Sequence, residues 1–357
     1  VLLRWLQDTS PDKLAMADKG IFCKDWIRYK LTEQLYTDLS DASTSLVDIK
    51  KGEISKDVFQ LLAIENQFSL VPEMIEPASI AGYITNEAAK MTGLKQGTPV
   101  ATGAFDVAST ALGTGAINTN DACVILGTSG CTITLSDNYI ADPSTRSGTE
   151  IFALTHKKMK VAATMAATPN LDWIFNIFHS GKSHSEVEKE LKSVPEGSNG
   201  VIYHPYISLS GERAPFYAPG ARAQFTGISL GTDALSMTRA VYEGVAFSIR
   251  DCLEGVKPNQ IFLAGGGAQS IFWAQIIADI TGVPILLPSE NETCARASAM
   301  MAGVAAGLYE NLQQAVSEFE QPKRIEPNLT RTSLYDELYS KFVRVREQML
   351  PIWNEQQ

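Results

Sequence analysis

Apolar residues recur at the spacing of an α-helix over residues 1–40 and again over 55–75, ahead of an extended stretch from Pro72 to Pro77. This pattern predicts that the first part of the chain is mainly helical. The pattern changes at residue 97, where a β-rich run ends in a glycine turn and a run of small residues follows. A strand, a polar turn and a helix are therefore predicted to meet near Asp106.

The middle of the chain has the pattern of antiparallel strands. Residues 122–136 and 151–166 are rich in β-branched residues, and each segment is broken by a turn, Gly127-Thr128-Ser129 in the first and Lys157-Lys158 in the second. Such pairs of runs are typical of β-hairpins. We expect a second domain to begin near Asn118.

The rest of the chain alternates between helical and strand-like segments. Helices are predicted at 170–178, 184–194, 233–256, 270–281 and 294–308, short strands at 261–266 and 283–288, a loop-rich stretch at 204–228, and an amphipathic helix at 332–353. The strand at 261–266, the glycines that end it and the helix that follows form a β-Gly-α unit.

The composition narrows the possible functions. A length of 357 residues favours two domains, and a formal charge of −10 with scattered Lys and Arg disfavours nucleic acid as a partner. No apolar run approaches the roughly 20 residues needed to span a bilayer, so we expect no membrane role. The five cysteines form no C-x-x-C pair and the four histidines no zinc motif. Free thiols in a reducing cytoplasm are the expectation.

Because residues 1–6 begin within a helical pattern and without Met, the sequence is expected to be part of a longer chain.

Two glycine motifs could hold phosphate. Gly127-Thr128-Ser129-Gly130 stands at a predicted hairpin tip, where backbone N–H groups and a hydroxyl can converge on a phosphate oxygen, although a plain β-turn has the same pattern. Gly265-Gly266-Gly267 follows a strand and is predicted to open a helix whose N-terminus would favour an anion, with Gln269 close behind. A tight strand-to-helix turn without a ligand is the alternative.

Charged residues in two turns could carry chemistry. Asp106 follows a glycine turn at the end of a strand, where an α/β protein presents catalytic carboxylates, and it could equally be the N-cap of the next helix. Arg213 and Arg222 lie in the loop-rich stretch; they could reach phosphates, but pairing with local carboxylates is the favoured interpretation.

Six ordered segments resemble the FGGY family of carbohydrate kinases. They are GAFD at 103–106, GTSG at 127–130, GERAPFYAP at 211–219, FTGISLGT at 225–232, YEGVAFSIRD at 242–251 and AGGGAQSIFWAQIIADITGVPI at 264–285. Within the family, LLRWL near the start and FDVASTAL at 105–112, with Val107 where xylulose and glycerol kinases carry an amide, are most similar to L-xylulose kinase. The family's opening D-x-G-T segment has no counterpart here, so we expect the first domain to be incomplete.

The resemblance implies an α/β fold of two ribonuclease-H-like domains, as in actin and hexokinase, with the active site in the cleft between them. The implied division is the C-terminal part of domain I at 1–117, the ATP-binding domain II at 118–325 and a C-terminal amphipathic helix at 326–357. The implied site residues are Asp106 as catalytic base, Phe105 and Asp106 beside the sugar, and Gly127, Thr128, Ser129, Gly265, Gly266, Gly267 and Gln269 around the nucleotide. No protein residue is assigned to a metal.

The implied activity is transfer of a phosphoryl group from ATP, with Mg²⁺, to a sugar hydroxyl, most simply that of L-xylulose or xylulose. Other possible substrates are 3-keto-L-gulonate or another ketose or polyol. A non-catalytic nucleotide- or sugar-binding sensor, or an inactive fragment of such a kinase, is the alternative from another functional class. A cytoplasmic homodimer is compatible with the resemblance.

Overall fold

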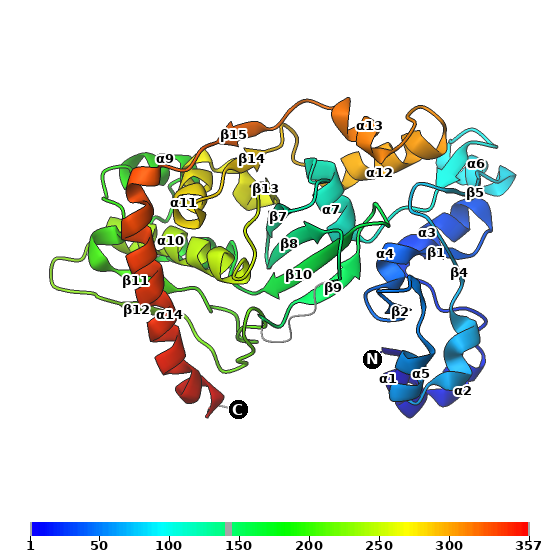
Figure 1. Ribbon diagram of the computed structural model, residues 1–357, viewed down its shortest axis with the longest axis horizontal. Coiled ribbons are helices and arrows are strands. Elements are labelled where there is room, and N and C mark those ends of the chain that lie inside the picture. Colours follow the sequence, from blue (N-terminus) through cyan, green and yellow to red (C-terminus); the bar gives the residue numbers. More distant parts are fainter. Residues whose placement is uncertain (1, 140–144, 356–357) are drawn as a thin grey trace.

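A seven-stranded mixed sheet forms the centre of the computed structural model, which describes residues 2–139 and 145–355 (Figure 1). The strand order is β15 (Lys323–Ile325), β14 (Ile285–Leu287), β13 (Gln260–Ala264), β7 (Asp121–Leu126), β8 (Gly130–Ser136), β10 (Lys158–Thr164) and β9 (Gly148–Ile151). Strands β7, β13 and β14 run parallel to one another, and the remaining neighbours pair antiparallel. This arrangement of a hairpin-rich half joined to parallel strands is the ribonuclease-H-like topology that the resemblance implied.

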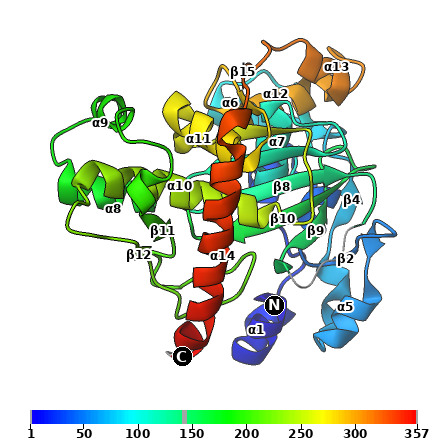
Figure 2. The same ribbon diagram turned by 60° about the vertical axis from the view of Figure 1, so that its left-hand side comes forward.

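Alternate residues of the central strands enter two separate cores. Val124 and Leu126 of β7 pack with β13 and with α10 (Ala234–Cys252) and α11 (Ile271–Thr281). Cys123 faces the other way, toward α7 (Asp106–Thr114) and α12 (Thr293–Ala305). Both faces are covered because side chains alternate along a strand and each face here is apolar. Figure 2 shows α14 (Thr332–Asn354) lying along the side of the molecule that carries α10.

The remaining elements of the second half are short. They are α8 (Pro169–Phe178), α9 (His184–Leu191), β11 (Ile202–His204), β12 (Gln224–Thr226) and α13 (Leu312–Ser317). None of the helices in the described part of the chain is both long and apolar enough to cross a bilayer. All five cysteines are free, as the sequence predicted.

The first part of the chain is less helical than its pattern predicted. It contains α1 (Leu2–Thr9), α2 (Pro11–Ala15), α3 (Cys23–Thr32), α4 (Leu39–Ala42), α5 (Lys56–Leu61) and α6 (Asn86–Thr92), and three two-stranded sheets: β1 (Tyr36–Asp38) with β4 (Glu73–Ile75), β2 (Val47–Asp48) with β3 (Glu53–Ile54), and β5 (Ile80–Tyr83) with β6 (Pro99–Ala101). Residues 36–38 were predicted as helix and are a strand, because they pair with residues 73–75, which sequence spacing could not show.

The β7–β8 hairpin and the later helices are confirmed. The second hairpin differs from its prediction, because its first strand ends at Ile151, its turn lies within 152–157 and Lys158 already belongs to β10. The second glycine motif lies ahead of its helix. Residues 266–269 form a short 3₁₀ turn, and α11 begins only at Ile271. Ser270 is its N-cap, and its hydroxyl accepts the N–H of Trp273 at 2.9 Å. Since Ser270 satisfies this first-turn N–H, the helix starts after the glycines and not at them.

Helix α7 lies unusually close to α12. A Cβ added at Gly113 would come within 1.8 Å of the carbonyl oxygen of Thr293, the first residue of α12. The side chain of Arg296 reinforces the contact, because its Nε donates to the carbonyl of Gly113 at 2.6 Å. Since α7 begins with Asp106, this contact also determines where that carboxylate stands.

We predict that Gly113→Ala destabilises the protein by about 1–3 kcal/mol, although alanine favours helix, because backbone of α12 occupies the space for the new methyl group. Urea unfolding measures this difference. The control is Gly20→Ala, whose Cβ would meet nothing closer than the Leu70 carbonyl at 3.9 Å and which should change stability by no more than about 0.5 kcal/mol. Equal stability of both variants would contradict the close helix contact.

Candidate active site

The two glycine motifs lie against each other at one edge of the central sheet. Strands β7 and β13 are parallel neighbours, with Ala264 opposite Ile125, so the turns that follow them emerge at the same edge. A Cβ on Gly265 would stand 2.6 Å from the carbonyl oxygen of Leu126, and one on Gly267 would stand 2.7 Å from the Leu126 Cβ. Gly265 also has a φ of +81°, which disfavours any other residue.

The first motif is the tip of the β7–β8 hairpin. The N–H of Gly127 donates to the carbonyl of Ser129 at 3.2 Å, and Thr128 and Ser129 are exposed at the tip. Thr168 fixes the tip from outside, because its hydroxyl and its N–H both donate to the Gly127 carbonyl, at 2.7 and 3.2 Å. The tip thus presents two hydroxyl groups and its backbone amides on a rigid support.

A pocket of about 450 Å³ adjoins this edge. Its lining includes Gly266, Gly267, Gln269, Thr168, Tyr242 and Trp273. Glycine backbone, aromatic rings and an amide side chain suit a flat, partly polar ligand such as a nucleoside. Of the predicted nucleotide-binding residues of the second motif, Gly266, Gly267 and Gln269 line this pocket, whereas Gly265 shapes the turn without lining it.

The sequence did not single out Glu188 or Thr168 beside this pocket. The Glu188 carboxylate accepts hydrogen bonds from the hydroxyls of Ser270 at 2.7 Å and Tyr242 at 3.1 Å, which connects α9 to the start of α11. Neither residue belongs to a motif, since Glu188 stands in an ordinary charged helix and Thr168 in a short connection. Only the tertiary structure brings them to the site.

Asp106 is exposed and is the first residue of α7. The N-cap position belongs to Phe105, so the interpretation of Asp106 as N-cap is wrong; its carboxylate instead accepts the N–H of Val107 at 2.7 Å. Burial raises the pKa of the thiol of Cys131, near the hairpin tip, and the charges of Glu150 and Asp106 raise it as well. The carboxylate therefore lies near the hairpin.

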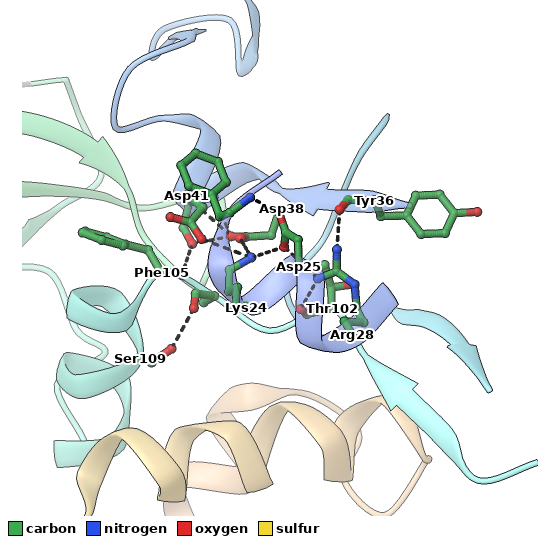
Figure 3. A network of polar contacts seen from close by, with 12 residues as sticks. Lys24, Asp25, Arg28, Tyr36, Asp38, Asp41, Thr102, Phe105 and Ser109 are labelled. Atoms are coloured by element: carbon green, nitrogen blue, oxygen red, sulfur yellow. Dashed lines mark hydrogen bonds and ion pairs between the residues drawn. The ribbon is translucent and has the colours of Figure 1, made fainter. Parts of the chain in front are cut away.

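A buried polar network holds the turn that carries Asp106. The N–H of Phe105 donates to the hydroxyl of Ser40 at 2.8 Å, and that hydroxyl in turn donates to the carboxylate of Asp38. Figure 3 shows the ammonium group of Lys24 among the acids of this network. Its Nζ lies 2.7 Å from Asp25, 2.6 Å from Asp38 and 3.2 Å from Asp41. Phe105 itself is half-buried against the core below α7.

Two acids near Asp106 hold protons more tightly than usual. Burial, together with the charges of Asp106 and Asp41, raises the pKa of Glu150 to about 7. Burial likewise raises the pKa of Asp41 to about 6, with Lys24 acting in the opposite direction. Oε2 of Glu150 is buried without a hydrogen-bond partner among the described residues. Several carboxylates thus share one region of the cleft edge, where a cation would be attracted.

The two loop arginines do not pair with carboxylates in the described part of the chain, so that expectation is wrong. Arg222 donates to the carbonyls of Pro219 at 3.0 Å and Ala221 at 2.7 Å. The buried Glu212 accepts backbone N–H groups, including that of Arg213 at 2.7 Å, and leaves the Arg213 guanidinium unused. Pairing with a local carboxylate was expected, but the carboxylate of Glu212 accepts hydrogen bonds from Thr164 and from backbone N–H groups instead.

We predict that Glu150 makes stability depend on pH. Its raised pKa means that folding favours the protonated acid, so its contribution is complete below about pH 4.5 and is lost as the pH rises through about 7. We therefore compare the free energy of unfolding of Glu150→Gln with that of the parent at each pH. The difference, variant minus parent, should be on the order of 2 kcal/mol more positive at pH 8 than at pH 5. Urea unfolding at both pH values tests this, with the exposed Glu87→Gln as control. A pH-independent difference would refute the assignment.

Comparison with known proteins places the chain in a family. The N-terminal domain model of the FGGY family of carbohydrate kinases matches residues 1–113, and the C-terminal domain model matches residues 122–306. The chain is 30% identical to an erythritol kinase of Brucella abortus (strain 2308), over 97% of this chain and 70% of that protein. It is 31% identical to a xylulose kinase of Staphylococcus epidermidis (strain ATCC 12228 / FDA PCI 1200), over 96% of this chain and 70% of that protein.

The crystal structure of ligand-bound xylulose kinase from Lactobacillus acidophilus superimposes with a TM-score of 0.91 at 25% identity, over 100% of this chain and 73% of that one. With its two glycine turns and its two matched domains, this chain belongs to the FGGY family of carbohydrate kinases.

Proposed function

We propose that this protein transfers the γ-phosphoryl group of ATP to a hydroxyl of a pentulose such as L-xylulose or xylulose. The observation that carries the proposal is the close packing of Gly265 and Gly267 against Leu126, which directly precedes the first glycine turn, with an exposed carboxylate near the hairpin. Phosphoryl transfer needs aligned reactants and charge stabilisation more than covalent help from the protein. The names of the similar proteins, xylulose kinases and an erythritol kinase, support a small ketose or polyol as acceptor.

Each part of the site has a distinct role in this proposal. The adenosine occupies the pocket at Gly266, Gly267 and Gln269, where bare backbone allows close approach. The hairpin Gly127-Thr128-Ser129 holds the β- and γ-phosphates through its amides and hydroxyls. Gly265 keeps both turns in contact.

Asp106 is the general base for the acceptor. It takes the proton of the sugar hydroxyl as the oxygen attacks the γ-phosphorus, and ADP leaves with the electrons of the broken P–O bond. Phe105, next in sequence and half-buried, contributes an apolar surface beside the sugar. Closure of the cleft would exclude water and so limit ATP hydrolysis.

Mg²⁺ is part of the proposal, because it binds triphosphates with the help of one or two carboxylates and keeps several waters. The charges of Asp106 and Glu150 act on each other, and the unpartnered Oε2 of Glu150 fits a site that attracts a cation. These two carboxylates would hold the ion through its water shell. When bound, the ion neutralises charge on the β- and γ-phosphates.

We predict that Asp106→Asn lowers kcat by roughly 10²–10⁴-fold, because the amide cannot accept the proton, while the Kd for ADP changes less than about twofold. Coupled ADP release and calorimetry measure the two quantities. Asp57→Asn is the matched control, since Asp57 is also an exposed acid in the first turn of a helix, α5. Retained turnover in the Asp106 variant would refute its role as base.

The substrate is tested with a panel on the parent protein: D-xylulose, L-xylulose, 3-keto-L-gulonate, erythritol and a blank without acceptor. We expect the highest kcat/KM with a pentulose. A preference for erythritol would overturn the pentulose assignment while leaving the reaction type intact, and absence of ADP release with every acceptor would overturn the proposed function itself.

A further inference from the structure

We propose that Arg213 is a further catalytic residue, whose guanidinium stabilises the negative charge on the phosphoryl group during transfer. The inference rests on the proposed function, and it adds a cation to a site in which the residues assigned so far are neutral or acidic. Three observations carry it: a buried carboxylate fixes the Arg213 backbone, that backbone adjoins the phosphate-binding hairpin, and the side chain has no partner in the described part of the chain.

The backbone of Arg213 is held by its neighbour Glu212. Glu212 is completely buried, and its carboxylate accepts the Thr164 hydroxyl at 2.8 Å, the Met165 N–H at 2.9 Å and the Arg213 N–H at 2.7 Å. A fourth donor, the N–H of Ala214, lies at 3.4 Å. A buried carboxylate with this many donors is a strong local restraint, since losing any of them would leave a buried charge less satisfied. The position of Arg213 is thereby defined before any ligand binds.

Glu212 also connects the loop to the sheet, because it accepts the hydroxyl of Thr164 beside the β7–β8 hairpin. Thr164 ends β10 and pairs with Gly130, the residue that follows the hairpin tip. The contact is tight, because a Cβ on Gly130 would stand 2.7 Å from the Thr164 methyl group. Glu212 therefore ties the loop of Arg213 to the strand end that supports Gly127-Thr128-Ser129.

The side chain of Arg213 remains free for a ligand. It is exposed, and within residues 2–139 and 145–355 its guanidinium forms no hydrogen bond or ion pair. By contrast, Arg239 and Arg346 are bound to the carboxylates of Glu243 and Asp251. An arginine with a fixed backbone and an uncommitted guanidinium is suited to bidentate binding of phosphate oxygens.

Its charge reaches the proposed site of transfer. Burial is the main cause of the raised pKa of the Cys131 thiol, which directly follows Gly130. The charges of Glu150 and Asp106 raise this pKa further, and the charge of Arg213 lowers it. The charges of Asp106 and Arg213 therefore both act on the start of β8, directly after the hairpin tip. A preorganised cation there acts on charge as it develops, without needing to reorganise.

In the balanced step, Asp106 accepts the proton of the acceptor hydroxyl, the new O–P bond forms, and the bond from the γ-phosphorus to the bridging oxygen of ADP breaks. Arg213 gains and loses no proton; its N–H groups donate to non-bridging oxygens of the transferred group. Comparable arginines in other phosphotransferases contribute several orders of magnitude to kcat.

The test compares Arg213→Ala and Arg213→Lys with Arg222→Ala, a control in the same loop whose guanidinium binds only backbone carbonyls in the described structure. Steady-state kinetics with ATP and the best pentulose are combined with calorimetry of ADP alone and of ADP with aluminium fluoride and sugar. We expect Arg213→Ala to lower kcat at least about 100-fold and to weaken the aluminium fluoride complex, with ADP affinity within about twofold. Arg213→Lys should recover part of the rate, and Arg222→Ala should match the parent.

A kcat for Arg213→Ala within threefold of the parent value would overturn the inference. So would an equal loss of affinity for ADP and for ADP with aluminium fluoride and sugar, because Arg213 would then contribute to ground-state binding only. Thermal unfolding checks that each variant is folded; if Arg213→Ala is not, the same criteria apply to Arg213→Lys. If the parent is active and the Arg213 variant is equally active, only the role of Arg213 is refuted. A parent inactive with every acceptor refutes the proposed function, and this inference with it.

Discussion

The parallel pairing of β7 with β13 is the constraint on which the site depends. Because the two strands run side by side in the same direction, their carboxyl ends meet at one edge, and the turns that follow must share the same space. That space is so small that Gly265 and Gly267 tolerate no side chain against Leu126. The site is thus made of backbone, which can approach a ligand closely and offers amides without side-chain entropy.

The remaining parts of the site are attached to this edge by rigid contacts. Helix α7 is held at its end by the approach of Gly113 to Thr293, and the turn before it by the hydrogen bond from Phe105 to Ser40. Both contacts determine the position of Asp106. Buried Glu212 acts similarly for the loop of Arg213. The carboxylate of Asp106 and the guanidinium of Arg213 thus come from two separate, well-supported segments.

The charges follow the needs of phosphoryl transfer. Acids that share a region, such as Glu150 and Asp41, are partly kept protonated by burial, so they do not simply repel an incoming triphosphate. The ammonium group of Lys24 offsets the negative charge of the buried Asp38. Asp106 and Arg213 are exposed, as their proposed roles toward substrate require.

Local pattern in the sequence determined much of this protein. The β7–β8 hairpin, the long helix α10 and the strand before Gly265 were predicted because alternation, helical spacing and glycine turns are properties of neighbouring residues. Tertiary contacts decided the rest. Residues 36–38 became a strand through pairing with 73–75, and the N-cap of α7 is Phe105 and not Asp106. The carboxylate of Glu212 accepts the hydroxyl of Thr164, at the end of a distant strand. Such outcomes depend on groups far apart in the chain, and only the folded structure brings those groups together.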